Sequence, residues 1–284
     1  MAALISEGTV AFVKGVAAEA QRLGTPCGEG HIIWRVWGSG PPLVLLHGGY
    51  GSWTHWIRNV LPLSRTFTIA APDLPGLGES ATPPKPHTAE GLARIIVEGL
   101  DTVFPKHTAL HIAGFSFGGV LGGHVAAQLG DRASTFTIVG SNGLGLVRQP
   151  TDLRRVPEGA SQAEILAIAR HNLGALMIAD PDKIDELAVY IQSHNAPRAR
   201  VKSRRFSRTD TLAQALPLIK ARLDGIWGER DATAFPHLDD RARSLRIIQP
   251  KARFEAIPGA GHWVQYEVAD RFNPLLAEIV GSPK

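Results

Sequence analysis

The sequence predicts an α/β protein in which a mostly parallel sheet carries helices on both faces. Short continuous apolar runs alternate along the chain with longer segments of helical period, the pattern of strands that are buried on both sides. With 284 residues, of which 44% are hydrophobic, the chain can bury one large core. Residues 146–216 depart from the alternation and indicate an inserted helical lid, so the core domain should consist of residues 1–145 and 217–284.

The expected elements follow this alternation in chain order. Apolar runs predict strands at 31–37, 43–46, 67–71, 109–115, 134–139, 223–227 and 253–257. Helical periods predict helices at 89–103, from 117 to about 129, at 238–248 and at 268–280. Within residues 1–24, apolar residues recur at helical spacing from Phe12 to Leu23, interrupted by Lys14 and Glu19, which predicts an amphipathic surface helix.

Composition excludes several classes of site. Cys27 is the single cysteine, so an intramolecular disulfide or a metal site built from cysteines cannot form. The net charge of +4 gives no reason to expect a nucleic-acid partner. No apolar run reaches the ~20 residues of a membrane span, and no secretory signal is evident. We therefore expect a cytoplasmic protein with a small-molecule substrate, whose oligomeric state stays open, a homo-oligomer included.

One short motif predicts a nucleophile. Gly114-Phe115-Ser116-Phe117-Gly118 lies between a predicted strand and a predicted helix. A serine on such a tight turn takes a strained backbone conformation, and the flanking glycines avoid side-chain collisions with neighbouring elements. The helix that follows would point free N–H groups toward the serine. Ser116 is therefore the candidate nucleophile.

A serine hydroxyl needs a base, and the base needs a partner that fixes its tautomer. Among the 11 histidines, His262 follows the last predicted strand, at the carboxyl edge of the sheet where α/β active sites gather. Asp231 occupies the corresponding turn after the preceding strand. Glu229 and Asp224 are the nearby alternatives for this third position.

At this point the sequence resembles the α/β-hydrolase family, in which serine, aspartate and histidine follow in this chain order. The resemblance extends to His47-Gly48-Gly49, which looks like the oxyanion-hole loop, and to the loop of residues 73–80. It implies that the backbone N–H groups of Gly49 and Phe117 hold the oxyanion, that His47 is structural, and that no cofactor or metal is needed. Asp73 reads as a turn residue.

Candidate substrate contacts lie beside this machinery. Tyr50, Trp263 and Gly48 are the predicted substrate-binding residues, with Phe117 as a further candidate for lining the pocket. A basic run in the lid comprises Arg198, Arg200, Lys202, Arg204, Arg205 and Arg208. It reads either as a solvated helix face or as a source of one or two arginines that bind a substrate carboxylate.

The predicted reaction is hydrolysis of a carboxylic ester, or a related acyl bond, through an acyl-enzyme on Ser116. An alternative comes from residues 261–267, which resemble the corresponding stretch of meta-cleavage-product hydrolases, enzymes that split carbon–carbon bonds. Phe115 departs from the asparagine usual in those enzymes before the nucleophile, which favours the ester. A ligand receptor that keeps the fold without turnover is a third hypothesis.

Overall fold

A computed structural model describes residues 5–282 and contains an eight-stranded sheet in the order β1-β2-β4-β3-β5-β6-β7-β8. From β4 and β3 through to β8 all neighbouring strands are parallel, whereas β2 runs antiparallel to both β1 and β4. The predicted mostly parallel sheet is thus confirmed. The strands are β1 (Gln21–Cys27), β2 (Gly30–Trp37), β3 (Pro42–Leu46), β4 (Thr68–Pro72), β5 (Leu110–Phe115), β6 (Ala133–Val139), β7 (Arg222–Gly228) and β8 (Arg253–Ile257).

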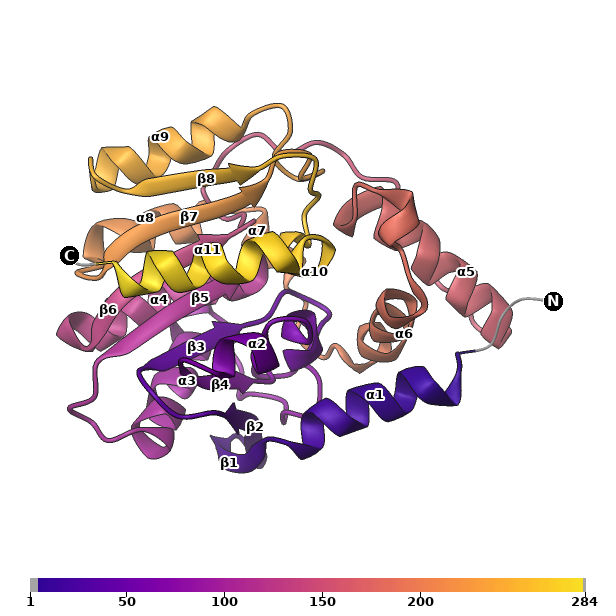
Figure 1. Ribbon diagram of the computed structural model, residues 1–284, viewed down its shortest axis with the longest axis horizontal. Helices are drawn as coiled ribbons and strands as arrows, with labels where there is room; N and C mark the ends of the chain where they lie inside the picture. Colours follow the sequence, from indigo (N-terminus) through magenta and orange to yellow (C-terminus); the bar gives the residue numbers. More distant parts are fainter. Residues whose placement is uncertain (1–4, 283–284) are drawn as a thin grey trace.

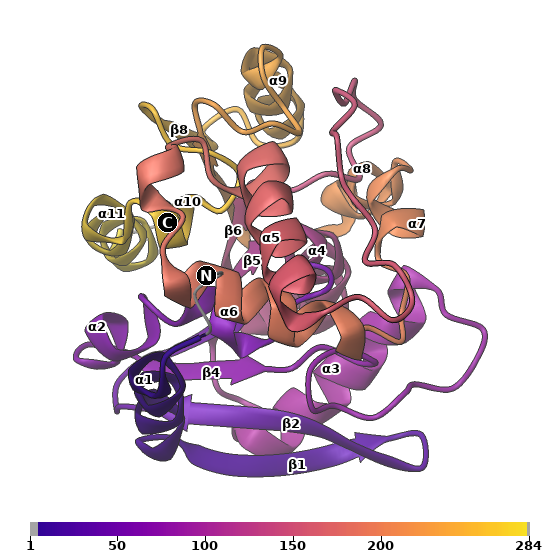
Figure 2. The same cartoon turned by 90° about the vertical axis from the view of Figure 1, so that its right-hand side faces the viewer.

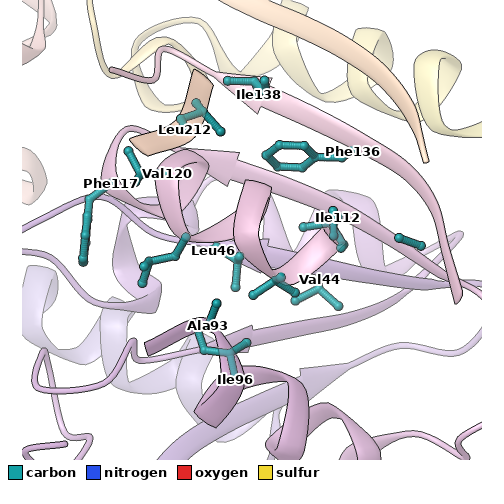
Figure 3. Close-up of a cluster of buried hydrophobic side chains, with 14 of the residues drawn as sticks. Val44, Leu46, Ala93, Ile96, Ile112, Phe117, Val120, Phe136, Ile138 and Leu212 are labelled. Atoms are coloured by element: carbon teal, nitrogen blue, oxygen red, sulfur yellow. The ribbon is translucent and has the colours of Figure 1, made fainter. Parts of the chain in front are cut away.

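Helices cover both faces of this sheet (Figure 1). Two apolar cores result, because successive strand residues point to opposite faces. Val44 and Leu46 of β3 pack into one core with helices α3 (Ala89–Val103) and α4 (Phe117–Leu129), and Figure 3 shows part of this cluster. Alternate residues of β3 enter the second core instead, which also holds residues of α1 (Glu7–Ala18), α2 (Val60–Ser64) and α11 (Ala269–Gly281). The remaining core helices are α9 (Leu238–Ile248) and α10 (Val264–Glu267).

The N-terminal prediction was wrong in its second half. The helix ends at Ala18, and residues that follow it form β1. This strand pairs with β2 over its whole length, and the Nε1–H of Trp34 donates a 2.8 Å hydrogen bond to Thr25 Oγ1 across the pair. A tight turn joins the two strands, with Gly28 at a φ of +57°. Sheet pairing, which sequence periodicity cannot detect, therefore overrides the helical pattern near Leu23.

A mainly helical segment connects β6 to β7. It contains α5 (Gln162–Asn172), the π-helical turn η3 (Leu173–Met177), α6 (Glu186–Asn195), α7 (Arg204–Ser207) and α8 (Thr211–Ala215). In Figure 2, α5 and α6 stand in front of the sheet, whereas α7 and α8 lie beside α4. Ser161 and Glu164 form a capping box that starts α5. Short 3₁₀ turns complete the chain at η1 (Trp53–Trp56), η2 (Gly130–Arg132), η4 (Pro181–Lys183), η5 (Ala196–Arg198) and η6 (Leu216–Leu218). Across residues 5–282, every helix is too short or too polar to cross a membrane.

Candidate active site

Ser116 occupies a strained turn between β5 and α4. Its φ of +52° is rare for a residue with a side chain, and the turn is held by a 2.9 Å hydrogen bond from the Ser116 N–H to Val139 O. A Cβ atom on Gly114 would lie 2.4 Å from Gly118 O, and one on Gly118 would lie 2.2 Å from Leu46 O. Close backbone packing therefore requires glycine at both flanking positions. The sequence motif predicted the same reason, namely that side chains there would collide with neighbouring elements.

The side chain of Ser116 meets His262, which lies far away in the sequence. The distance from Ser116 Oγ to His262 Nε2 is 3.0 Å, and His262 Nδ1 lies 2.8 Å from Asp231 Oδ2. The side chains of His262 and Asp231 are buried, at 3% and 0% exposure. With the proton on Nδ1, the imidazole donates to Asp231 and its Nε2 can accept the proton of the serine.

Asp231 is fixed by a second set of contacts. Its Oδ1 accepts hydrogen bonds from the N–H and the hydroxyl of Thr233, both at 2.8 Å. The Thr233 hydroxyl in turn accepts one from Asn142 Nδ2 at 3.1 Å. These contacts leave Oδ2 directed at the imidazole. The two alternative carboxylates lie elsewhere: Asp224 accepts from Arg222 Nε, and Glu229 accepts from the Gly259 N–H.

Two backbone N–H groups near Ser116 have no acceptor within the described part of the chain. They belong to Gly49, after β3, and to Phe117, the first residue of α4. The two residues are neighbours, since a Cβ on Gly49 would lie 3.6 Å from the Cβ of Phe117. Such a pair of free donors can bind a developing oxyanion. Tyr50, which follows Gly49 in this loop, adopts a φ of +57°.

Two buried histidines shape this loop. His47 Nε2 accepts a 2.8 Å hydrogen bond from the Leu74 N–H, and its Nδ1 lies 2.7 Å from Gly48 O. His55 Nδ1 accepts a 3.2 Å bond from the Gly48 N–H. Burial lowers the pKa of His47 to about 4 and that of His55 well below its usual value, so both rings are neutral. Sequence reasoning missed His55.

Asp73 is a buried turn residue rather than part of this cluster. Its Oδ1 accepts a hydrogen bond from the Trp53 N–H, and its Oδ2 accepts one from the Glu79 N–H, both at 2.8 Å. The carboxylate thus joins the loop after β4 to η1, as expected of an aspartate that satisfies backbone donors in a turn.

A cavity of about 490 Å³ opens at Ser116 and His262. Gly48, Gly49, Tyr50 and Phe117 line it, together with apolar side chains from α5 and η3 such as Ile165, Ile168, Leu176 and Met177. Trp263 does not line it. Its indole is fully buried, stacks on Tyr266 and donates a 2.8 Å bond to His55 O. The large aromatic ring next to His262 in the sequence is therefore a packing element.

The arginines divide into two groups. From the predicted basic run, Arg198 and Arg200 donate to backbone carbonyls, while Arg204 lines the cavity. Three more arginines of the cavity wall, Arg148, Arg154 and Arg155, were not singled out from the sequence. They lie in the connection before α5, which carries no motif. Within residues 5–282, no group of three or more His, Cys, Asp or Glu side chains could hold a metal ion.

Comparison with known proteins places this geometry in a family. The sequence model described as "Alpha/beta hydrolase family" matches residues 43–275. The chain is 26% identical over 265 residues to a 2-hydroxy-6-oxononadienedioate/2-hydroxy-6-oxononatrienedioate hydrolase from Comamonas testosteroni, covering 86% of this chain and 89% of that protein. It is also 26% identical over 294 residues to the dihydrolipoyllysine-residue acetyltransferase component of an acetoin cleaving system from Pseudomonas putida, covering 97% of this chain and 72% of that protein.

Solved structures share the fold at lower identity. Carboxylesterase CesB from Bacillus subtilis superposes with a TM-score of 0.75 at 18% identity, covering 98% of this chain and 100% of that one. A meta-cleavage product hydrolase from Pseudomonas fluorescens IP01, complexed with acetates, gives a TM-score of 0.70 at 20% identity, covering 88% of this chain and 94% of that one. These two likenesses establish the architecture only.

Proposed function

Because the chain belongs to the alpha/beta hydrolase family, we propose that it is a serine hydrolase that cleaves a carboxylic ester of a small molecule. The observation that carries the proposal is the continuous chain of contacts from Ser116 Oγ through the His262 ring to Asp231, with links of 3.0 and 2.8 Å. Serine, imidazole and carboxylate in this order form a charge-stabilised nucleophile and base.

The proposed reaction has two stages. Ser116 Oγ attacks the carbonyl carbon while His262 Nε2 takes its proton, and the oxyanion forms against the N–H groups of Gly49 and Phe117. The imidazolium, stabilised by Asp231, then gives the proton to the departing alcohol, leaving an acyl-enzyme. Water activated by His262 releases the acid, and the enzyme returns to its starting state.

We also propose that residues 146–216 act as the lid of this site. Side chains of α5, η3 and α6 supply much of the cavity wall, and Tyr266 Oη donates to Asp185 just before α6. The lid would therefore select the substrate, whereas the loops after β5, β7 and β8 supply the reacting groups.

A fluorophosphonate probe tests the proposal directly. The wild-type protein should be labelled on Ser116, and Ser116→Ala should abolish labelling while leaving the fold unchanged by circular dichroism. His262→Ala should slow labelling by at least about a hundredfold, since general-base catalysis contributes about 10²–10⁴ in rate. An unreactive wild-type serine would support a ligand receptor instead of an enzyme.

A carbon–carbon hydrolase is the second candidate. The relative from C. testosteroni is named as a hydrolase of 2-hydroxy-6-oxononadienedioate, a dicarboxylate, and arginines of the cavity wall could bind such an acid substrate. Turnover of p-nitrophenyl esters of increasing chain length should be compared with turnover of a vinylogous diketo acid. A higher kcat/KM for the diketo acid would reverse the ranking.

A further inference from the structure

A second cavity of about 630 Å³ adjoins the one at Ser116. The two share Asn142, Arg148, Leu153, Arg155, Arg204 and Ser207 as wall residues, so they are contiguous. The first cavity is lined mainly by apolar side chains, whereas the wall of the second is rich in arginines. One ligand could therefore place a carbonyl at Ser116 and a polar group in the second cavity.

The charged side chains in the wall of the second cavity are all positive. Its wall contains Arg148, Arg155, Arg204, Arg208 and Arg241, and among the residues that the structure describes no Asp or Glu side chain lines either cavity. Arg241 is already used, since it donates to the backbone carbonyls of Val147, Thr233 and His237. Within residues 5–282 the other four guanidinium groups make no hydrogen bond and no ion pair, although Arg204 Cζ lies 5.8 Å from the centre of the Tyr50 ring.

Arg148 lines both cavities and is partly buried. Burial lowers its pKa, and the positive charges of Arg208 and Arg204 add to that effect, with the negative charge of Asp231 opposing it. The guanidinium is therefore close to like charges and to the catalytic aspartate. Gathering several positive charges around one nearby carboxylate is unfavourable, and a bound anion would relieve the repulsion.

We propose that the second cavity binds a phosphate monoester group carried by the substrate. A single carboxylate brings one negative charge and is satisfied by one bidentate guanidinium, whereas a phosphate brings up to two charges and three acceptor oxygens. Four arginines without an ion pair match the larger demand. The claim that the phosphate is part of the hydrolysed ester rests on the proposed function. The claim that the cavity binds phosphate is independent of it.

Direct binding tests the site without catalysis. Inorganic phosphate and acetate should be titrated into the Ser116→Ala protein by calorimetry at pH 7.5 and low ionic strength, where screening is weak. We expect phosphate to bind at least about tenfold more tightly than acetate, a difference of ~1.4 kcal/mol. Equal affinities, or tighter binding of acetate, would overturn the proposal.

Arginine variants in the same background test the location. Arg208→Ala and Arg148→Ala should each weaken phosphate binding by about tenfold. Arg208 is exposed, so its variant stays informative if Arg148→Ala fails to fold. Arg205 is the matched control, because it is exposed on α7, three residues before Arg208, but lines neither cavity. If Arg205→Ala weakened phosphate binding equally, the phosphate would be attracted by the general positive charge of this surface. That result would overturn the proposed site.

Kinetics with the active protein connect the site to the reaction. Three esters should be compared that differ only in a terminal phosphate, carboxylate or hydroxyl. We expect the highest kcat/KM for the phosphate, with the advantage lost in Arg208→Ala and kept in Arg205→Ala. Phosphate binding without turnover of any ester would refute the proposed function alone. Ester turnover without phosphate binding would refute the phosphate site alone.

Discussion

The backbone N–H of Gly261 donates a 2.7 Å hydrogen bond to Oε2 of Glu267. The same carboxylate accepts bonds from the N–H groups of Ala179 and Asp180, at 3.1 and 2.9 Å. Gly261 directly precedes His262, whereas Ala179 and Asp180 follow the π-helical turn η3. One buried carboxylate therefore joins the loop of the proposed base to the helical segment that covers the site.

This relationship predicts that Glu267 positions His262. In Glu267→Gln, one oxygen acceptor is replaced by an NH₂ group that faces backbone donors, and a hydrogen bond to a charged group contributes about 1.5–3 kcal/mol. We expect kcat to fall by about tenfold with little change in KM, and the free energy of unfolding to fall by about 2 kcal/mol. Denaturant titration and steady-state kinetics measure both.

Glu98→Gln is the control for this variant, because Glu98 is exposed on α3 and should tolerate the change. If Glu267→Gln lost stability but kept the wild-type kcat, Glu267 would be a structural residue without a positioning role.

The parts of the site that the sequence predicted are those with a local signature. Ser116 was identifiable because the strain of its turn demands glycines at fixed offsets, and His262 and Asp231 because each follows a strand of a parallel sheet. The succession of strands along the chain from β2 to β8 followed from the alternation of apolar runs and helical periods. Chain connectivity then brought the three side chains to one edge.

The missed parts depend on contacts between distant segments. Trp263 lies beside His262 in sequence, yet its ring turns into the core to reach Tyr266 and His55 O. Arg148 lines both cavities only because the connection after β6 folds back against them. A side chain's direction is set by such packing, and neither periodicity nor motif spacing contains that information.

His55 provides a second prediction, since it holds the Gly48 N–H of the proposed oxyanion loop. His55→Phe keeps an aromatic ring in the pocket but removes the acceptor at Nδ1, so the loop should lose its orientation. We expect kcat to fall by about ten- to a hundredfold, up to the ~10²–10³ seen when an oxyanion donor is removed.

His55→Asn is the matched rescue, because its Oδ1 can occupy the position of Nδ1 and accept the same hydrogen bond. This variant should keep kcat within about threefold of wild type if the acceptor is what matters. Equal losses in the two variants would instead indicate that the imidazole is needed for packing or for contact with substrate.

Gly140 gives a third prediction from its position beside the proposed triad. Its φ is +51°, and an added Cβ would lie 3.2 Å from Asp231 Oδ2 and 3.4 Å from His262 Nδ1. Gly140→Ala should therefore push the aspartate and the imidazole apart and lower kcat by about tenfold, besides costing about 1–2 kcal/mol of stability for the left-handed backbone.

Gly130→Ala separates these two effects. Gly130 has a similar φ of +57°, but no atom lies within 4 Å of an added Cβ. This variant should lose a similar amount of stability and keep wild-type kcat. A normal kcat in Gly140→Ala would show that the Asp231 and His262 pair tolerates the added methyl group.

The fourth prediction concerns stability against pH. Burial holds His47 and His55 neutral, and it also lowers the pKa values of His124 and His194. When the chain unfolds below a pH of about 6.5, these rings bind protons that the folded state does not hold, so stability falls as the pH falls. Asp73 opposes the trend, because burial raises its pKa to about 6 and it releases a proton on unfolding between pH ~4 and 6.

The balance of protons bound by these groups sets how steeply the free energy of unfolding changes with pH. His47 and His55 together take up about two protons and Asp73 gives back about one, so the free energy of unfolding should fall by at least about 1.4 kcal/mol per pH unit between pH 6 and 5. Urea titrations at pH 7, 6 and 5 measure it. A flat profile, or one that rises toward pH 5, would mean that at least one of the two buried rings already carries a proton in the folded protein. If that ring is His55, its Nδ1 could not accept the hydrogen bond from the Gly48 N–H, and if it is His47, its Nε2 could not accept the one from the Leu74 N–H.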